Sequence, residues 1–193
     1  MATGCRIRAL ACSVIACVAF GANLPTRVGP VAPDLSNRSV YPLSDSAKVN
    51  VFVFARIDCP VTNRYAPELK RVAQEFADKG VKFWLVYPDR SETAEEIQKH
   101  IEDYGFPGTP LRDPDRVLER YAKATVAPEA AVFDAAGRLR YHGRIDDRWV
   151  AFGKSRQEAS RHDLEIAISE VLEGRAVSVA ETRAIGCYLA DLQ

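Results

Sequence analysis

Hydrophobic residues in the first half of the chain follow two patterns, continuous apolar runs and helical periodicity. The runs at 48–58 (KVNVFVFARID) and 81–89 (VKFWLVYPD) are rich in β-branched and aromatic residues, which is typical of strands buried on both faces. A helix is predicted between them, because apolar residues recur at helical spacing up to the sequence DKG, at Tyr65, Leu69, Val72, Ala73 and Phe76. A second helix is predicted over 91–105, with Ser91 or Thr93 as its cap.

The second half of the chain predicts an antiparallel hairpin and a final helix. After a loop (FPGTPLRDPD) and a short helix (DRVLERYAKA), strands at 130–134 and 138–145 flank the turn sequence DAAG. The last helix is predicted over 160–174, where Ser160 and Asp163 resemble a capping box. Strands joined by helices run parallel and hairpin strands run antiparallel, so the order predicts an α/β fold with a mixed sheet and helices on both faces.

The first 22 residues have the pattern of an export signal. A basic start (MATGCRIR) precedes an apolar segment (ALACSVIACVAFGA) that is shorter than the roughly 20 residues of a membrane-spanning helix. Ala19 and Gly21 fit an ordinary cleavage site, whereas 14–17 resembles a lipobox that ends the signal at residue 16 and places a lipid on Cys17. Both alternatives predict an exported protein, either periplasmic or tethered to a membrane and facing the periplasm.

Length and charge limit what the rest of the chain can be. The 193 residues accommodate one well-cored domain, predicted at 48–175, with a linker at 23–47 and an extended tail at 176–193. The chain carries 26 basic and 26 acidic residues, without the excess of positive charge that a nucleic-acid surface needs. We therefore expect no nucleic-acid partner.

The positions of the cysteines indicate chemistry. Three of the five lie in the leader, so Cys59 and Cys187 are the pair that belongs to the folded part. In an exported protein such a pair forms a structural disulfide, stays as two inert thiols, or reacts. The position of Cys59 favours reaction, because it lies where a buried strand turns into a helix and the start of a helix stabilises a thiolate.

Four local features resemble the thioredoxin fold. Cys59-Pro60-Val61-Thr62 takes the place of the thioredoxin CxxC motif, and Pro67 has the spacing of the proline inside the first active-site helix. Val126-Ala127-Pro128 resembles the cis-proline segment beside the reactive sulfur, and VFDAAGRLRYHGRID resembles the redoxin hairpin. Residues 45–175 are thus similar to the AhpC/TSA (redoxin) group. This resemblance implies a thioredoxin-like three-layer α/β/α fold with a mixed central sheet and a C-terminal antiparallel hairpin.

The same region departs from the best-described members of this superfamily. Peroxiredoxins carry Thr or Ser three residues before the peroxide-reactive cysteine, where this chain has Arg56. Dithiol thioredoxins have a second cysteine where Thr62 stands, and copper chaperones of this fold have one where Asn63 stands. Peroxide and disulfide substrates therefore both stay open.

The resemblance implies a thiol oxidoreductase that needs no cofactor. Cys59 is the expected nucleophile and Cys187 the expected resolving thiol, while Thr62, Pro128 and Arg144 shape the catalytic site. The expected substrate-binding residues are Pro60, Asn63, Ala127 and Glu129. The substrate is a disulfide protein or a peroxide, and an external reductant, such as an exported thioredoxin system, recycles the enzyme.

Two alternatives use the same residues. Sulfur and imidazole ligands suit Cu(I), so Cys59, Cys187 and His142 form an alternative metal site of a metallochaperone-like module. The other alternative is a binding domain that keeps the thioredoxin fold without turnover.

Overall fold

The computed structural model describes residues 1, 29–44 and 46–190. The predicted export signal, with its cleavage sites and the lipidation candidate Cys17, lies outside these residues apart from Met1. Within the described part, no helix has the length and the apolar composition that crossing a membrane requires.

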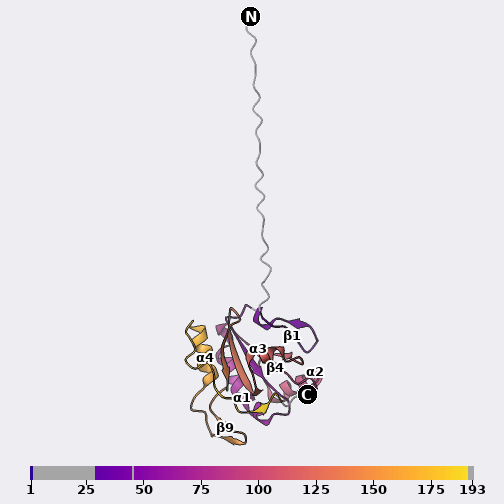
Figure 1. Ribbon diagram of the computed structural model, residues 1–193, viewed down its shortest axis with the longest axis vertical. Coiled ribbons are helices and arrows are strands. Elements are labelled where there is room, and N and C mark those ends of the chain that lie inside the picture. Colours follow the sequence, from indigo (N-terminus) through magenta and orange to yellow (C-terminus); the bar gives the residue numbers. More distant parts are fainter. Residues whose placement is uncertain (2–28, 45, 191–193) are drawn as a thin grey trace.

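A five-stranded mixed sheet forms the centre of the molecule (Figure 1). Its spatial order is β5-β4-β3-β7-β8, in which β3 pairs in parallel with β4 and antiparallel with β7. The parallel pair β4–β5 and the antiparallel pair β7–β8 complete it. The strands are β3 (Val49–Phe54), β4 (Val81–Tyr87), β5 (Thr109–Arg112), β7 (Glu129–Asp134) and β8 (Leu139–Gly143).

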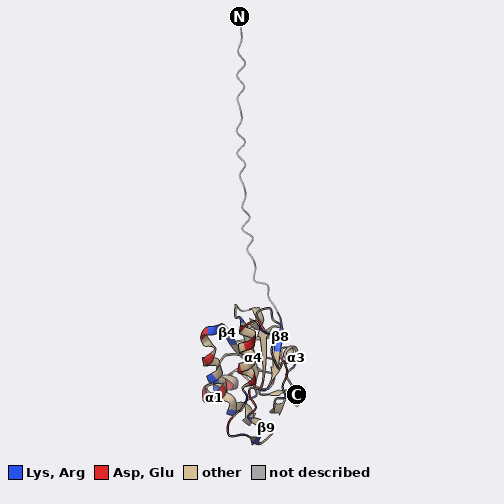
Figure 2. Ribbon diagram, turned by 90° about the vertical axis from the view of Figure 1, so that its left-hand side faces the viewer, with Lys and Arg blue, Asp and Glu red and all other residues tan. Residues whose placement is uncertain are grey.

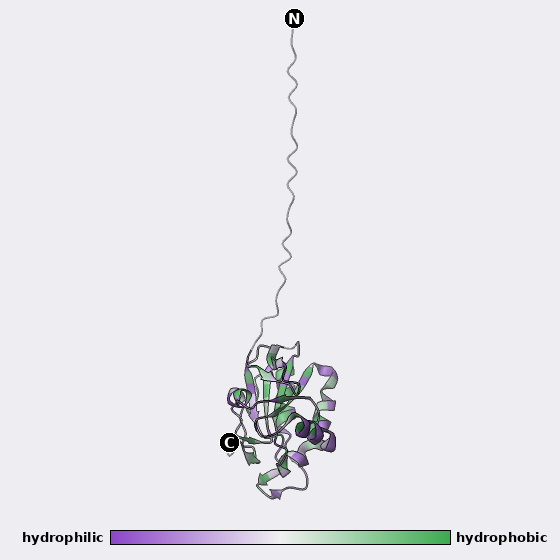
Figure 3. Ribbon diagram, turned by 90° about the vertical axis from the view of Figure 1, so that its right-hand side faces the viewer, coloured by the Kyte–Doolittle hydropathy of each residue, from purple (hydrophilic) through white to green (hydrophobic). Residues whose placement is uncertain are grey.

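Helices cover both faces of the sheet, as predicted. One face packs against α1 (Pro60–Glu75), α2 (Ala94–Tyr104) and α4 (Asp163–Leu172), and the other against α3 (Val117–Ala122). Along β3 the buried side chains alternate between two core clusters, because successive strand residues point to opposite faces. Figure 3 shows the resulting arrangement, with hydrophobic strands inside and hydrophilic helix surfaces outside.

Short elements complete the fold. A 3-10 turn at Ala77–Lys79 follows α1, and β9 (Trp149–Ala151) and β10 (Lys154–Ser155) form a small hairpin. The strand β6 (Val126–Ala127) pairs with β11 (Cys187–Tyr188) in a separate two-stranded sheet. The C-terminal tail is thereby fixed to the domain.

The two segments predicted as a loop and as a linker contain short strands. The predicted loop at 106–115 includes β5, a four-residue edge strand whose Pro110 disguises it in the sequence. The predicted linker at 23–47 contains the hairpin of β1 (Ala32–Pro33) with β2 (Ser39–Val40) and a 3-10 turn at Pro42–Ser44. This segment buries Ala32 and Leu43 in the hydrophobic cluster that also contains the buried residues of α3. Strands of two residues are too short to show periodicity.

The predicted helix caps had mixed outcomes. Thr93 forms a capping box with Glu96 at the start of α2, so of the two candidates Thr93 is the cap. The predicted capping box of the last helix is wrong, because α4 has His162 at its N-cap without a side-chain bond. Ser160 instead bonds to Asp147, through both its backbone N–H and its hydroxyl.

Candidate active site

Cys59 lies at the N-cap of α1, in the turn that follows β3, and its side chain is fully buried. The turn is held through Ile57, whose backbone N–H donates to Glu92 Oε1 at 2.7 Å. The Ile57 carbonyl accepts from Asn63 Nδ2 at 3.1 Å. Helix α1 and the loop just before α2 thus fix the loop that carries the sulfur.

The second cysteine reaches this sulfur from the C-terminal tail. Strand β11 places Cys187 opposite Ala127, and the sulfur atoms of Cys59 and Cys187 lie 2.6 Å apart as free thiols. The Cys59 thiol also donates to the Ala127 carbonyl at 3.0 Å. The Ala127–Pro128 peptide bond is cis, as the sequence predicts. The structure thus brings together Cys59, Cys187, Ala127 and Pro128.

The tail is anchored on both sides of Cys187. Before it, the Thr182 side chain accepts the Arg144 N–H at 3.1 Å and bonds the Tyr141 hydroxyl at 2.6 Å. After it, the buried Leu189 donates its N–H to Thr125 at 3.0 Å and accepts from Arg116 at 2.7 Å. Cys187 is therefore held in position from two directions.

Glycine at position 186 is what lets the tail cross the cis-proline segment closely. A Cβ atom on Gly186 would overlap the carbonyl oxygen of Ala127 and lie 3.0 Å from the nitrogen of Pro128. A side chain there requires the tail or the segment beneath it to move.

Glu129 is buried, and it supports the cis-proline segment. Its Oε2 accepts the backbone N–H groups of Thr125 and Val126 at 2.8 and 3.3 Å. Its Oε1 lies 3.3 Å from His142 Nδ1, and the other ring nitrogen of His142 lies 3.6 Å from Glu181. In this structure Glu129 holds the loop together.

Asn63, an expected substrate-binding residue, directs its side chain inward. Its Oδ1 lies 2.7 Å from His100 Nε2, and His100 Nδ1 lies 2.9 Å from the Tyr87 hydroxyl. The three side chains form a hydrogen-bonded line from the Cys59 turn into the core. Burial lowers the pKa of His100, so at neutral pH it serves in this line as a neutral imidazole.

Thr62, expected to shape the catalytic site, donates no hydrogen bond to Cys59. Its side chain is fully buried, and its hydroxyl has no hydrogen-bond partner among the described residues. Of its two neighbours in the motif, Pro60 is exposed at the first position of α1 and Val61 is buried.

The arginines near the site are engaged in structural contacts. Arg56 donates to Asp58 at 3.0 Å and to the Tyr188 carbonyl at 3.2 Å, which links the Cys59 turn to the tail. Arg144 pairs with the buried Asp163 at 2.6 Å. The charges after β8 therefore fix loops, although Arg144 also lines the groove beside Cys187.

An open groove of about 1310 Å³ runs along the outer side of the tail. Cys187 lines it, together with Val126 and Glu129 of the cis-proline region and with Trp149 and Phe152 of the β9 hairpin. Cys59 does not belong to its lining. Figure 1 shows the yellow β11 at the same end of the molecule as β9.

Two pKa values at the site are raised. Burial, followed by the hydrogen bond to Cys59, raises the pKa of Cys187. Burial also raises the pKa of Glu92 to about 7, against a smaller lowering effect of its hydrogen bond from Ile57. The second carboxyl oxygen of Glu92 is buried without a partner among the described residues. The sequence showed no sign of Glu92, because only the fold brings it to Ile57.

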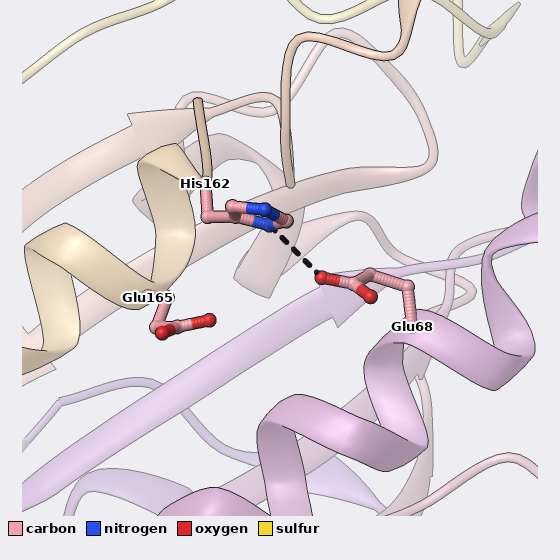
Figure 4. A group of neighbouring side chains, drawn as sticks. All are labelled: Glu68, His162 and Glu165. Carbon is pink, nitrogen blue, oxygen red and sulfur yellow. Dashed lines mark hydrogen bonds and ion pairs between the residues drawn. The ribbon is translucent and has the colours of Figure 1, made fainter. Parts of the chain in front are cut away.

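The described residues contain one potential metal-binding group, and it is not the predicted alternative. Glu68, His162 and Glu165 converge within 4.8 Å between α1 and α4, with His162 bonded to Glu68 (Figure 4). Arg71 pairs with both glutamates, so a cation already neutralises them. The expected set of Cys59, Cys187 and His142 does not form such a group.

Comparison with known proteins identifies the family and the fold. The model of the AhpC/TSA family matches residues 28–142, which include Cys59 and Pro128. No curated protein matches the chain.

Three solved structures illustrate the shared fold. A hypothetical protein of Sinorhizobium meliloti 1021 is 24% identical, with a TM-score of 0.70 over 84% of this chain and 91% of that one. An uncharacterized conserved protein of Geobacillus kaustophilus is 21% identical, with a TM-score of 0.70 over 84% of this chain and 88% of that one. A secreted disulfide oxidoreductase of Mycobacterium tuberculosis is 20% identical, with a TM-score of 0.52 over 77% of this chain and 97% of that one.

The family match covers more than half of the chain, and the fold is the thioredoxin-like α/β/α arrangement of the solved structures. The chain belongs to the AhpC/TSA family.

Proposed function

We propose that the protein is a thiol–disulfide oxidoreductase whose redox pair is Cys59 and Cys187. The observation that carries the proposal is the 2.6 Å separation of the two sulfur atoms. A disulfide bond is about 2.05 Å long, so closing it requires a small movement of a tail that is already positioned. The Mycobacterium tuberculosis neighbour is a disulfide oxidoreductase, which agrees with this chemistry in a protein of the same fold.

The reaction is a two-electron exchange. The reduced pair gives up two electrons and two protons and becomes the Cys59–Cys187 disulfide, while an external disulfide becomes two thiols. The reverse reaction oxidises two external thiols. In either direction the protein ends in the opposite redox state, so an external thiol–disulfide partner must reset it.

A disulfide is favoured over peroxide as the substrate. The position three residues before Cys59 holds Arg56, whose two terminal guanidinium nitrogens donate to the Tyr188 carbonyl and to Asp58. The Cys59 sulfur itself contacts Ala127 and Cys187. An exported location is part of the proposal, and the basic and apolar composition of the leader supports it.

The test is a comparison of oxidants on the reduced protein. In a background with Cys5, Cys12 and Cys17 replaced by serine, one equivalent of oxidised glutathione or hydrogen peroxide is added and free thiols are counted over time. We expect oxidised glutathione to consume both thiols and form the internal disulfide faster than peroxide does. Cys59→Ser and Cys187→Ser are the controls, because neither can form that disulfide. If neither oxidant consumes the thiols, the proposal is wrong, and faster oxidation by peroxide would indicate a peroxidase.

A further inference from the structure

The two sulfurs of the pair differ in their access to solvent. Cys59 is completely buried, whereas Cys187 is half-buried and lines the groove. Cys187 lies over Cys59, and the tail backbone at Gly186 lies directly on the Ala127 carbonyl that Cys59 also contacts. A partner approaching through the groove therefore meets Cys187.

The tail remains in place when the cysteines are reduced, because its contacts do not depend on a disulfide. The anchors at Thr182 and Leu189 are hydrogen bonds and a buried side chain, and neither involves a cysteine. The Arg56 bond to the Tyr188 carbonyl adds a third anchor next to Cys187. Cys59 is thus covered in the reduced protein.

The groove is large enough for a peptide segment. Its volume of about 1310 Å³ exceeds the roughly 300–1,000 Å³ of pockets for small ligands. Its wall includes the exposed side chains of Val150 and Phe152 on the β9 hairpin. Lys123 and Arg183 also line it and form no ion pair with another described residue, so their positive charge attracts an approaching thiolate.

We infer that the mixed disulfide with an external peptide thiol forms on Cys187, and that Cys59 only makes and breaks the internal bond. This assignment rests on the proposed function. The resemblance implies instead that Cys59 reacts with the substrate and Cys187 resolves the product. In our assignment Cys187 reacts with the external partner and Cys59 is the resolving thiol.

The exchange balances with a peptide dithiol as the reductant. The first peptide thiolate attacks Cys187 Sγ of the oxidised protein, a peptide–Cys187 disulfide forms, and the Cys59–Cys187 bond breaks. Cys59 leaves with the electron pair as a thiolate at the start of α1, where the helix dipole stabilises negative charge. The second peptide thiolate attacks the sulfur of the first, which releases the peptide disulfide and Cys187, and both protein thiolates take protons from the solvent.

The raised pKa of Cys187 favours one direction of this exchange. At neutral pH reduced Cys187 is a protonated thiol, which is a poor nucleophile toward an external disulfide. In the oxidised protein Cys187 is the electrophile, so its own pKa does not slow the attack by an external thiolate. Oxidation of external dithiols is therefore the faster direction.

The test maps the cysteine that carries the external thiol. The oxidised full chain is mixed with reduced glutathione, quenched with acid within the first turnover, alkylated, digested and analysed by mass spectrometry, which separates both peptides from those of the leader. We expect glutathione on Cys187 and the alkylating group on Cys59 in about a tenfold excess over the opposite arrangement. Equal amounts, or an excess of glutathione on Cys59, would overturn the inference.

Single-cysteine variants, made in the background with Cys5, Cys12 and Cys17 replaced by serine, give the same answer if the mixed disulfide does not accumulate. Cys59→Ser removes the hydrogen bond to Cys59 that helps to raise the pKa of Cys187, and Cys59 in Cys187→Ser stays buried. With oxidised glutathione, Cys187 in Cys59→Ser should therefore react about tenfold faster than Cys59 in Cys187→Ser. Adding Gly186→Ala to Cys187→Ser should uncover Cys59 and accelerate its reaction about tenfold, because the new Cβ pushes against Ala127. Gly105→Ala is the matched control, since its Cβ would meet no atom within 4 Å. Equal rates for the two single-cysteine variants would overturn the inference.

Failure of the inference is distinguishable from failure of the proposed function. If the wild-type protein forms the internal disulfide but glutathione attaches to Cys59, the redox pair stands and the assignment of the entering sulfur is wrong. If no internal disulfide forms, the proposed function fails, whatever the single-cysteine rates are.

Discussion

Individual side chains around Cys59 are arranged to hold a loop. Asn63 donates to the Ile57 carbonyl, and Glu92 accepts the Ile57 N–H. Glu129 accepts two backbone N–H groups close to Pro128. These contacts position the two segments between which the sulfur lies. The Thr62 hydroxyl and one Glu92 oxygen are among the buried groups at the site that lack partners within the described residues. Both give predictions at the scale of a single residue.

Thr62→Val should stabilise the protein by about 1 kcal/mol, because it replaces an unsatisfied buried hydroxyl by a methyl group of the same shape. Urea unfolding of both proteins measures the difference. Thr62→Ala is the control, since it removes the hydroxyl but also leaves a cavity. A loss of stability in Thr62→Val would show that the hydroxyl has a partner in solution.

Glu92 should make stability depend on pH. Its pKa is raised from 4.5 to about 7 in the folded state, so between these values the folded protein binds more protons than the unfolded chain. Stability should therefore fall by about 3 kcal/mol as the pH rises through this window. Glu92→Gln should remove this dependence, measured by unfolding at pH 5 and pH 7.5.

The exposed Glu95, three residues after Glu92 in the first turn of α2, provides the control for this measurement, because Glu95→Gln should leave the pH dependence unchanged. An unaltered pH slope in Glu92→Gln would contradict the assignment of the effect to Glu92.

At the scale of elements, the C-terminal tail behaves as a strand that the domain adds to its cis-proline segment. Strand β11 has two residues, and the contacts at Thr182 and Leu189 supply most of its attachment. Such a segment opens locally at a lower free energy than the central sheet. The accessibility of Cys59 depends on this opening.

Leu189→Ala should loosen the tail. Truncating a fully buried leucine costs about 2–5 kcal/mol, and here most of that cost falls on the docking of the tail. Hydrogen exchange should become faster in the peptide around Cys187 and change little in β3. Val179→Ala, at an exposed position of the same tail, is the matched control. Uniformly faster exchange throughout the domain would mean that the tail is not a separate unit.

Elements with clear periodicity and the short helix α3 were predictable from the sequence, and the shortest strands were not. The long apolar runs became β3 and β4, and the cysteine between strand and helix identified one half of the site. The strand β5 was missed because Pro110 interrupts its pattern. The start of α4 was misplaced because Ser160 hydrogen-bonds to Asp147 and does not cap the helix. Glu92 and His100 were missed because their partners are distant in sequence and only the fold brings them together.

At the scale of the molecule, the two sulfurs connect the ends of the domain. Cys59 begins the first long helix and Cys187 lies near the C-terminus, so their bond would close a loop that spans most of the described chain. The ribbon in Figure 2 shows acidic and basic residues interspersed along the fold, in line with the balanced charge of the sequence. Because the Cys59–Cys187 bond would restrict the unfolded chain, we expect redox state to change the stability of the whole fold.

Oxidation should stabilise the protein as a whole. Closing a loop of this length removes unfolded-state entropy worth about 5 kcal/mol in the chain-entropy model. Guanidinium unfolding of the oxidised and the phosphine-reduced protein measures the difference. Cys187→Ser should unfold at the same midpoint under both conditions. Equal midpoints for the two wild-type forms would contradict the predicted linkage.

The central claim is that Cys59 and Cys187 form one reversible redox pair, and mass mapping of the oxidised chain tests it most directly. After mild oxidation and digestion without reductant, the account predicts that the peptides of Cys59 and Cys187 are linked, with the loss of two hydrogens. Reduction should separate them again. If both thiols stay free, or if either cysteine links to the leader or to a second molecule instead, the account is wrong.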